Sequence, residues 1–241
     1  MSECKHSLYA PSAVAAQFRI ISLRKDVMAE ITEISWTKSE PVSIRDYGNA
    51  CGFNLITIDI MQLPESQKGW IERKIVSNIL ADLDWLWEEN EWSTPLHQVE
   101  KGIYVITIAR NICIDYKKSY SQVVYVGRGK IRSRIYSHLR NWVYYFSESL
   151  QDISFHFWMT EIKIPGSPNA FMDVESELLC RFKDRFGEYP ILNYKAGNSC
   201  TVEHSYDRSL TKPFYNAPNL KTGWKIKPMP ENEWFKEIEE I

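Results

Sequence analysis

The feature that most constrains the fold is a pair of apolar segments, residues 102–109 and 122–127, separated by a polar stretch. Both segments are rich in β-branched and aromatic residues, which favour strands. Two such strands joined by one polar connection pair as an antiparallel hairpin. We therefore expect a hairpin with a long polar tip, and the surrounding segments must supply the apolar surface that covers its faces.

The surrounding segments carry the other elements of the fold. Residues 69–87 have apolar side chains at helical spacing and predict a helix with a broad apolar face. After the hairpin, the pattern predicts a helix over 131–146, a third strand over 153–162 and a second helix over 170–186. The order strand, strand, helix, strand, helix indicates an α+β fold, in which a small antiparallel sheet is flanked by helices.

The chain divides by pattern into a central module and two extensions. We expect the central module at residues 101–197. Residues 1–95 form a mixed α/β N-terminal extension, in which 13–31 favour a helix and 53–60 alternate like a half-buried strand. Residues 198–241 form a C-terminal arm, which is polar, interrupted by prolines, and ends in a short acidic helix.

Composition and charge limit the classes of function. With 44% hydrophobic residues in 241, the chain is expected to be globular. The formal net charge of -2 argues against a protein that coats nucleic acid non-specifically. The charge is uneven, however, because the stretch from Lys101 to Arg140 has nine basic residues and one acid, Asp115. This basic stretch predicts a local surface for a polyanion.

The N-terminal residues and the cysteines predict an intracellular protein. The N-terminal residues contain no apolar run long enough for a signal peptide or a membrane helix. The five cysteines include no pair at metal-binding spacing, and we expect reduced structural thiols. We therefore expect a cytoplasmic protein without a membrane partner.

Two short motifs lie on the predicted hairpin. The triplet GIY ends at Tyr104 on the first strand, and the triplet YVG begins at Tyr125 on the second. Because paired strands share their two faces, side chains from both strands meet on each face. The hairpin is therefore expected to place the two tyrosines side by side.

The two helices of the central module carry polar residues beside their apolar stripes. Arg134 and His138 are four positions apart and therefore lie on one helical face, next to the stripe. On the 170–186 helix, Glu175 falls inside the apolar stripe, whereas Asp173 and Glu177 fall outside it. A carboxylate placed toward a core is costly unless a cation holds it there. We therefore expect a metal ion or an arginine beside Glu175.

These motifs, in this order, make the sequence resemble the GIY-YIG nuclease family. The matching elements are the GIY strand, the YVG strand, the helix with Arg134 and His138, Glu175 on a later helix, and Asn193. The resemblance covers about 95 of the 241 residues and implies that the central module is catalytic. Arg132 stays an alternative for the arginine role, because the interval between the YVG triplet and Arg134 is one residue shorter than the family pattern.

The resemblance implies metal-dependent hydrolysis of DNA phosphodiester bonds. Glu175 would bind one divalent ion, Mg²⁺ or Mn²⁺, which stabilises the leaving oxygen, and Arg134 would neutralise charge on the phosphorane. Tyr104 is the candidate for removing a proton from water, while Tyr125 and His138 either orient water and phosphate or share that proton relay. Three cations, Arg128, Lys130 and Arg132, are expected to contact DNA. The side-chain amide of Asn193 is expected to complete the site.

The size of the chain and its flanking extensions resemble the restriction endonucleases of the family more than its repair or homing enzymes. Cutting both strands with one active site per chain favours a two-fold homodimer on double-stranded DNA. The 69–87 helix or the C-terminal helix would supply the interface. Two other interpretations stay open: a DNA-binding module of the same fold without catalysis, and a structural or protein-interaction domain whose motifs coincide by chance.

Overall fold

A computed structural model describes residues 31–55, 62–109, 112–149, 153–193, 205–215 and 224–226 of the chain. The fold is α+β, as the sequence predicts, and a four-stranded sheet lies at its centre. All neighbouring strands of this sheet are antiparallel. Their order is β2 (Thr37–Lys38), β7 (Phe155–Glu161), β3 (Gly102–Ile108) and β6 (Val123–Gly129).

The predicted hairpin and the predicted third strand form the main part of this sheet. β3 and β6 pair directly, with Tyr104 opposite Gly127 and Ile106 opposite Tyr125. The polar tip is not an open loop, because it carries two short strands of its own. The tip and a C-terminal segment form a second sheet from β4 (Ile112–Asp115), β5 (Tyr120–Ser121) and β9 (Trp224–Ile226).

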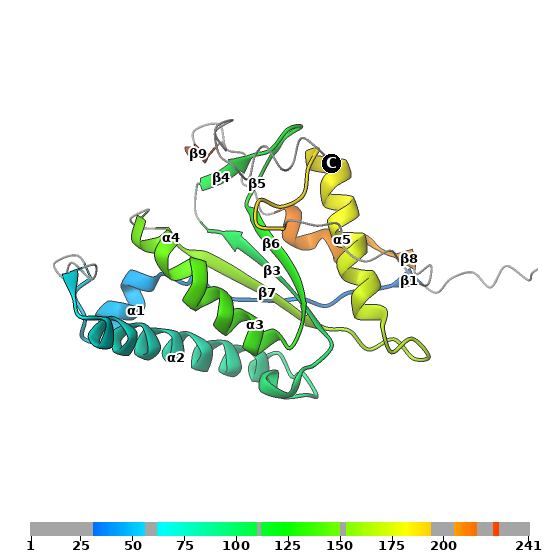
Figure 1. Cartoon of the computed structure of the whole chain (residues 1–241). Coiled ribbons are helices and arrows are strands. Elements are labelled where there is room, and N and C mark those ends of the chain that lie inside the picture. Colours follow the sequence, from blue (N-terminus) through cyan, green and yellow to red (C-terminus); the bar gives the residue numbers. More distant parts are fainter. Residues whose placement is uncertain are drawn as a thin grey trace, which may run out of the picture.

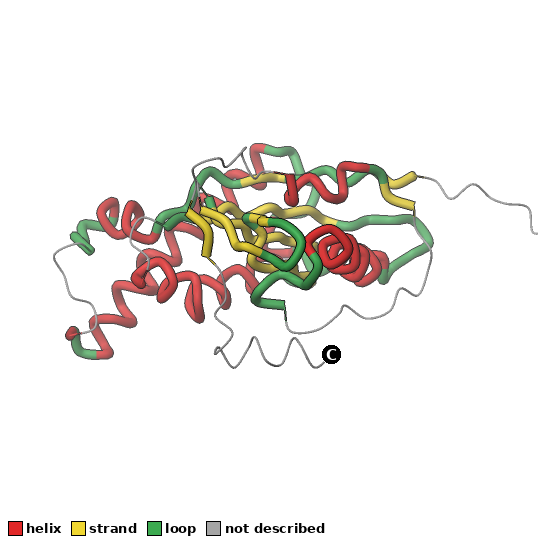
Figure 2. The backbone as a smooth tube through the Cα atoms, turned by 90° about the horizontal axis from the view of Figure 1, so that it is seen from above, coloured by secondary structure: helices red, strands yellow, loops and turns green. Residues whose placement is uncertain are grey.

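Helices cover both faces of the central sheet, as two perpendicular views show (Figure 1, Figure 2). The predicted helices over 69–87 and 170–186 are confirmed as α2 (Glu65–Glu89) and α5 (Ala170–Phe186). The helix expected over 131–146 is present with a π turn, Leu139–Val143, between α3 (Ile131–His138) and α4 (Tyr144–Ser149). α2, α3 and α4 lie on one side of the sheet, and α5 lies on the other.

The long helix α2 buries its apolar stripe inside the chain. Ile75 and Ile79 are fully buried, whereas Trp70 and Trp85 are 56% and 59% exposed. The stripe therefore belongs to the core, and a subunit interface on this helix would have to use its outward residues. Only the outward aromatic residues of α2 remain for that role. Neither α2 nor any other helix in the described segments is long and apolar enough to cross a membrane.

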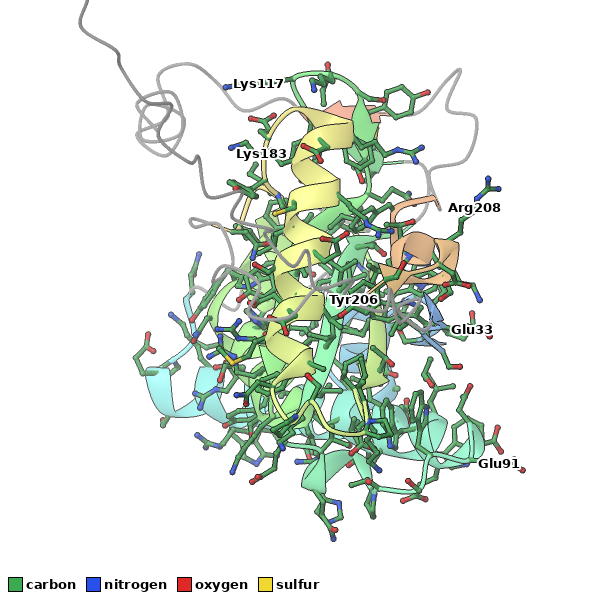
Figure 3. All side chains as sticks on the ribbon, turned by 90° about the vertical axis from the view of Figure 1, so that its right-hand side faces the viewer. Glu33, Glu91, Lys117, Lys183, Tyr206 and Arg208 are labelled. Carbon is green, nitrogen blue, oxygen red and sulfur yellow. The ribbon has the colours of Figure 1, made fainter. Side chains whose placement is uncertain are left out.

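Part of the C-terminal arm packs against the central module. β8 (Ser205–Tyr206) pairs in parallel with β1 (Ile31–Thr32). The next element, η4 (Arg208–Tyr215), lies beside α5 (Figure 3). Phe214 of η4 contacts Phe182 and Phe186 of α5, with ring centroids 5.3 and 6.3 Å apart. This segment of the arm is therefore held by an aromatic cluster.

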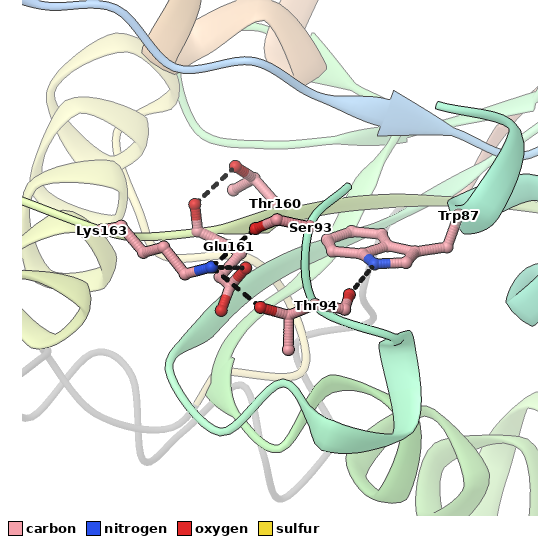
Figure 4. Close-up of polar contacts among 6 residues, drawn as sticks. All are labelled: Trp87, Ser93, Thr94, Thr160, Glu161 and Lys163. Atoms are coloured by element: carbon pink, nitrogen blue, oxygen red, sulfur yellow. Dashed lines mark hydrogen bonds and ion pairs between the residues drawn. The ribbon is translucent and has the colours of Figure 1, made fainter. Parts of the chain in front are cut away.

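The N-terminal extension is built into the outer edge of the central sheet. β2 pairs with β7, and α1 (Ile44–Ala50) packs against α2. The chain then passes through η2 (Leu96–Gln98) into β3. Lys163, beyond the end of β7, lies 3.0 and 2.8 Å from the hydroxyl oxygens of Ser93 and Thr94 (Figure 4). These contacts tie the loop after α2 to the sheet.

Three sequence expectations fall wholly or partly outside the described residues. Of the strand expected over 53–60, only 53–55 are described, and they form loop and turn. The helix expected over 13–31 lies outside them except for Ile31, which belongs to β1. The acidic helix expected at the C-terminus lies outside them as well.

Candidate active site

The candidate site begins at the two tyrosines of the hairpin. Tyr104 in β3 is fully buried, and Tyr125 in β6 is partly exposed. Their ring centroids lie 5.9 Å apart, and the ring planes are inclined at 29°. The structure therefore brings the two tyrosines side by side, as the hairpin predicts.

The glycine of each triplet leaves room for this arrangement. A Cβ atom at Gly127 would overlap the phenol ring of Tyr104, which lies directly against that backbone position. A Cβ atom at Gly102 would overlap the side chain of Ile131 at the start of α3. Neither glycine has a positive φ. Both are therefore required by close packing and not by an unusual backbone conformation.

Helix α3 adds an arginine and a histidine to the tyrosines. Arg134 is exposed, and its guanidinium group hydrogen-bonds to the hydroxyl groups of Tyr104 and Tyr125. His138 is half-buried, with its Nε2 atom 2.9 Å from the Tyr104 hydroxyl oxygen. Its ring centroid lies 4.4 Å from that of Tyr125. Four of the predicted residues thus form one connected cluster.

The structure distinguishes the two arginines that the sequence leaves as alternatives. The Nε atom of Arg132 lies 3.0 and 2.9 Å from the two carboxylate oxygens of Asp84 on α2. Arg132 is therefore engaged with α2, and it is Arg134 that contacts the tyrosines. The shorter interval before Arg134 does not prevent that contact.

Burial sets the protonation states of this cluster. Burial raises the pKa of Tyr104 far above its ordinary value, and Tyr125 adds to this rise, while Arg134 opposes it. Burial, aided by the Arg134 cation, lowers the pKa of His138 to about 4. At neutral pH the free protein therefore holds a protonated Tyr104 and a neutral His138. A base role for Tyr104 requires more positive charge nearby than Arg134 alone supplies.

The predicted carboxylate lies on the other side of the sheet, on α5. The Glu175 side chain is only 14% exposed, and its Oε2 atom lies 2.7 Å from Nη1 of Arg128. Arg128 directly follows the YVG triplet in β6, and strand alternation directs it to the face opposite Tyr125. A buried carboxylate is expected to have a metal ion or an arginine as its partner, and the chain itself supplies the arginine.

Desolvation and two nearby arginines shift the pKa of Glu175 in opposite directions. Burial raises the pKa of this carboxyl group above its ordinary value, while the positive charges of Arg128 and then Arg134 lower it. Arg134 therefore lies within electrostatic reach of Glu175 as well as of the tyrosines. It links the parts of the candidate site on the two sides of the sheet.

One expectation about α5 is wrong. The sequence places Asp173 outside the apolar stripe, but this residue is only 3% exposed. It lies in the first turn of α5, where the free backbone N–H groups of a helix favour a carboxylate. Glu177 lies toward solvent as predicted and pairs with Arg181 at 2.6 Å.

Asn193 binds the edge strand of the sheet. Its Oδ1 atom accepts a hydrogen bond from the Val126 N–H group at 2.9 Å, and its Nδ2 donates to the Val126 carbonyl oxygen at 2.8 Å. The backbone N–H group of Leu192 donates to the Val124 carbonyl oxygen at 3.1 Å. Because β6 is the last strand in the sheet order, Asn193 stands where a neighbouring strand would pair. These contacts give it a positioning role at the YVG triplet.

In the fold, acidic side chains pair with several cations of the basic stretch from Lys101 to Arg140. Each of the three predicted DNA contacts has an acidic partner in the free protein, and so does a further arginine at the end of the stretch. The Lys130 pair is exposed on both sides, and such pairs contribute little. The four ion pairs are Arg128–Glu175, Lys130–Glu100, Arg132–Asp84 and Arg140–Glu72.

One member of the cluster, Trp142, was not predicted from the sequence. Trp142 lies in the π turn that follows His138, and its indole N–H group donates to Nδ1 of His138 at 2.8 Å. The spacing of four positions was a signal for this contact, since it places both residues on one helical face. The apolar periodicity instead assigns Trp142 to the core stripe. π turns are frequent at functional sites.

Glu175 fits a metal ion that needs only one protein carboxylate. Among the described residues, no three histidine, cysteine, aspartate or glutamate side chains gather in a way that would hold a metal ion. Mg²⁺ often binds through one or two carboxylates and completes its shell with water and phosphate oxygens. Such an ion at Oε2 of Glu175 would compete with Arg128, which lies 2.7 Å from that oxygen.

Comparison with known proteins leaves the site to be interpreted from its own geometry. No protein-family model, no curated protein and no solved structure matches this chain.

Proposed function

We propose that this chain is a metal-dependent endonuclease that hydrolyses phosphodiester bonds in DNA. The observation that carries the proposal is the convergence of Tyr104, Tyr125, Arg134 and His138 in one hydrogen-bonded cluster, with Glu175 within electrostatic reach of Arg134. The resemblance to the GIY-YIG family rests on the order of these residues along the sequence. Their gathering in space is a separate observation that supports it.

Each group has a task in the hydrolysis. Arg134, exposed and cationic, binds the scissile phosphate and stabilises the charge that develops on it. After one phenol of the tyrosine pair has released its own proton to solvent, the resulting phenolate takes the proton from the attacking water, and Arg134 stabilises this charged form. Glu175 would hold a divalent ion, Mg²⁺ or Mn²⁺, which would supply positive charge for the leaving oxygen. Asn193 holds the YVG strand in place.

Arg128 has two successive partners in this proposal. In the free protein it neutralises Glu175, which would otherwise be an unpaired carboxylate in a partly buried position. When Glu175 takes a metal ion, Arg128 is released and contacts a DNA phosphate next to the site. Lys130 and Arg132, at the start of α3, exchange their acidic partners for phosphates in the same way.

We further propose that the substrate is double-stranded DNA and that the enzyme acts as a restriction-type nuclease in the cytoplasm. Two active sites related by two-fold symmetry cut the two strands, which requires a homodimer. The outward aromatic residues of α2, Trp70 and Trp85, are candidates for the contact between chains. Light scattering tests this point: a mass of one chain, with and without DNA, contradicts the dimer.

Cleavage of long unmethylated DNAs tests the proposed activity. The lanes contain purified protein with Mg²⁺, with EDTA, and the variants Glu175→Ala and Glu177→Ala. Glu177 is the matched control, because it lies on the same helix and pairs with Arg181 outside the site. Discrete fragments with the wild type and Glu177→Ala, absent with EDTA and Glu175→Ala, support a sequence-specific nuclease. Intact DNA in every lane, with Mg²⁺ or Mn²⁺, contradicts it.

The second candidate is a DNA-binding module of the same fold without catalysis. It is favoured by the Arg128–Glu175 ion pair and by the raised pKa of Tyr104, which describe a site that is not poised for reaction in the free protein. Binding of duplex DNA in a gel-shift assay, combined with intact DNA in every cleavage lane, would decide for this candidate.

A further inference from the structure

Both ring nitrogens of His138 are engaged in hydrogen bonds. Nδ1 lies 2.8 Å from the indole nitrogen of Trp142, and Nε2 lies 2.9 Å from the hydroxyl oxygen of Tyr104. An indole nitrogen carries a hydrogen and has no lone pair to accept one. Nδ1 of His138 is therefore the acceptor in the contact with Trp142. In a neutral imidazole the single hydrogen must then lie on Nε2.

The direction of the remaining hydrogen bonds follows from this tautomer. His138 donates from Nε2 to the Tyr104 oxygen, which also accepts from Arg134. With both acceptor positions of that oxygen filled, Tyr104 directs its own hydrogen to Tyr125, with which it is hydrogen-bonded.

We infer that Trp142 is a positioning residue that fixes the tautomer of His138, so that His138 serves the tyrosine pair as an N–H donor and not as a proton acceptor. The inference rests on the proposed nuclease function and narrows the role of one of its residues. The only lone pair of the neutral ring is on Nδ1, and this lone pair faces Trp142. A relay that passes a proton from water through Tyr104 to His138 has no acceptor in this arrangement.

An N–H donor suits the chemistry at Tyr104. When the phenol loses its proton, the oxygen becomes an anion in a buried position, and hydrogen bonds to the charged form favour it. His138 and Arg134 supply two such donors from one helix. The low pKa of His138, about 4, agrees with a ring that stays neutral throughout. His138 therefore stabilises charge on Tyr104 without exchanging protons.

Packing holds the indole in place for this task. Trp142 contacts Phe155 of β7 edge to face, with ring centroids 5.7 Å apart and planes at 84°. The π turn that contains Trp142 begins at the residue directly after His138. The position of the indole is therefore fixed by the sheet and by the local helix geometry, independently of the histidine.

Nitrogen NMR of the full-length protein tests the tautomer directly. Long-range ¹H–¹⁵N correlations of the ¹⁵N-labelled protein at pH 7 report which nitrogen of each of the five histidines carries hydrogen. The His138 signal is identified by its loss in His138→Gln. We expect an Nε2–H ring in the wild type and a mixture of both tautomers in Trp142→Phe. An Nδ1–H ring or an imidazolium in the wild type overturns the inference.

Trp92→Phe is the matched control for Trp142→Phe. The indole of Trp92 also donates one hydrogen bond, to the Thr37 hydroxyl oxygen at 2.7 Å, and lies outside the cluster. The His138 signal should be unchanged in this variant. If Trp142→Phe also leaves it unchanged, the tautomer does not depend on the indole and the inference is wrong.

Cleavage rates of two His138 variants test the donor role. A glutamine amide can donate an N–H hydrogen bond near the position of Nε2 but cannot serve as a proton relay. We expect His138→Gln to stay within about tenfold of the wild-type rate and His138→Ala to lose about 100-fold. Equal losses in both variants contradict the donor role. If no variant cleaves DNA, the nuclease proposal fails, whereas the NMR result still decides the tautomer.

Discussion

The two faces of the β3–β6 hairpin differ in how ready they are for chemistry. On the face toward α3, the Tyr104 oxygen already has His138 and Arg134 as hydrogen-bonding partners, and Tyr125 lies beside it. On the face toward α5, the carboxylate of Glu175 is neutralised by an arginine of the same chain. The groups around the Tyr104 oxygen are therefore positioned in advance, whereas the carboxylate proposed to bind the metal ion is paired with a counter-ion that has to move.

Strand geometry explains why one short motif serves both faces. Successive side chains of β6 point to opposite sides, so that Tyr125 meets the α3 cluster while Arg128, three positions later, meets α5. Asn193 holds the backbone between them by its two hydrogen bonds to Val126. A shift of this strand would therefore disturb both faces at once.

The largest expected effect separates the two arginines of α3. Arg134→Ala should lower the DNA cleavage rate by about 100- to 1,000-fold, because it removes the cation that meets the phosphate and the tyrosine oxygens. Arg132→Ala removes an ion pair with Asp84 and one proposed phosphate contact, both outside the tyrosine cluster, so at saturating DNA it should change the rate by about threefold or less. Single-turnover rates at saturating Mg²⁺ compare the two variants.

The reverse result would break the assignment of roles on the α3 face. If Arg132→Ala were the inactive variant and Arg134→Ala active, the contact of Arg134 with the tyrosines would be structural. Unfolding curves of both variants serve as the control, since each protein must be folded for the comparison to hold.

The second prediction concerns acid stability on the same face. The unfolded chain protonates His138 near pH 6.5, whereas the folded protein holds its pKa at about 4. The unfolded state thus binds more protons between these values, and stability falls as the pH falls from 6.5 toward 4. The loss between pH 7 and pH 4.5 is roughly 2.5 kcal/mol. Urea unfolding of the wild type and His138→Gln at pH 7 and pH 4.5 measures it, and equal losses in both proteins contradict the lowered pKa.

Local sequence pattern was sufficient to predict the elements of the central module. The helix over 170–186 has the same bounds in the structure because its ends are chemically marked, with Pro168 before it and Gly187, at φ 88°, directly after it. The hairpin was predictable because its strands are close in sequence and strongly β-forming. In the candidate site, the tyrosine pair follows from the hairpin and the shared face of Arg134 and His138 follows from helical spacing, whereas the contact between the two sets was implied only by the family resemblance.

Contacts between distant segments could not be predicted from the local sequence pattern. β2 pairs Thr37 with Met159, more than 100 positions away, and nothing in the short β2 segment indicates that partner. The basic stretch shows the same limit, since its neutralising acids come partly from α2. The Arg128–Glu175 pair is different. Strand alternation places Arg128 on the α5 face, so this partner of Glu175 could have been predicted from the sequence.

The third prediction tests the positioning role between the two faces. Asn193→Ala removes two hydrogen bonds to the backbone of Val126 and should lower the free energy of unfolding by about 1–2 kcal/mol. Asn169→Ala is the matched control, because Asn169 is exposed and its side chain makes no capping hydrogen bond. Thermal unfolding compares the two variants. Equal stability of both would mean that water replaces Asn193 at the edge strand without cost.

The smallest expected effect addresses the α5 face alone. Arg128→Gln removes the cation that competes with a metal ion for Glu175, so Mn²⁺ should bind about three- to tenfold more tightly, or roughly 1 kcal/mol. Removing Arg128 also raises the pKa of Glu175, since its charge normally lowers it, and the gain in affinity should therefore shrink as the pH falls. Calorimetry at pH 8 and pH 6 measures both effects without DNA.

Lys130→Gln, which removes an equal charge from an exposed pair with Glu100, is the control. Weaker Mn²⁺ binding in Arg128→Gln would mean that the arginine supports the metal site, and the contrast between a ready face and a closed face would then be wrong.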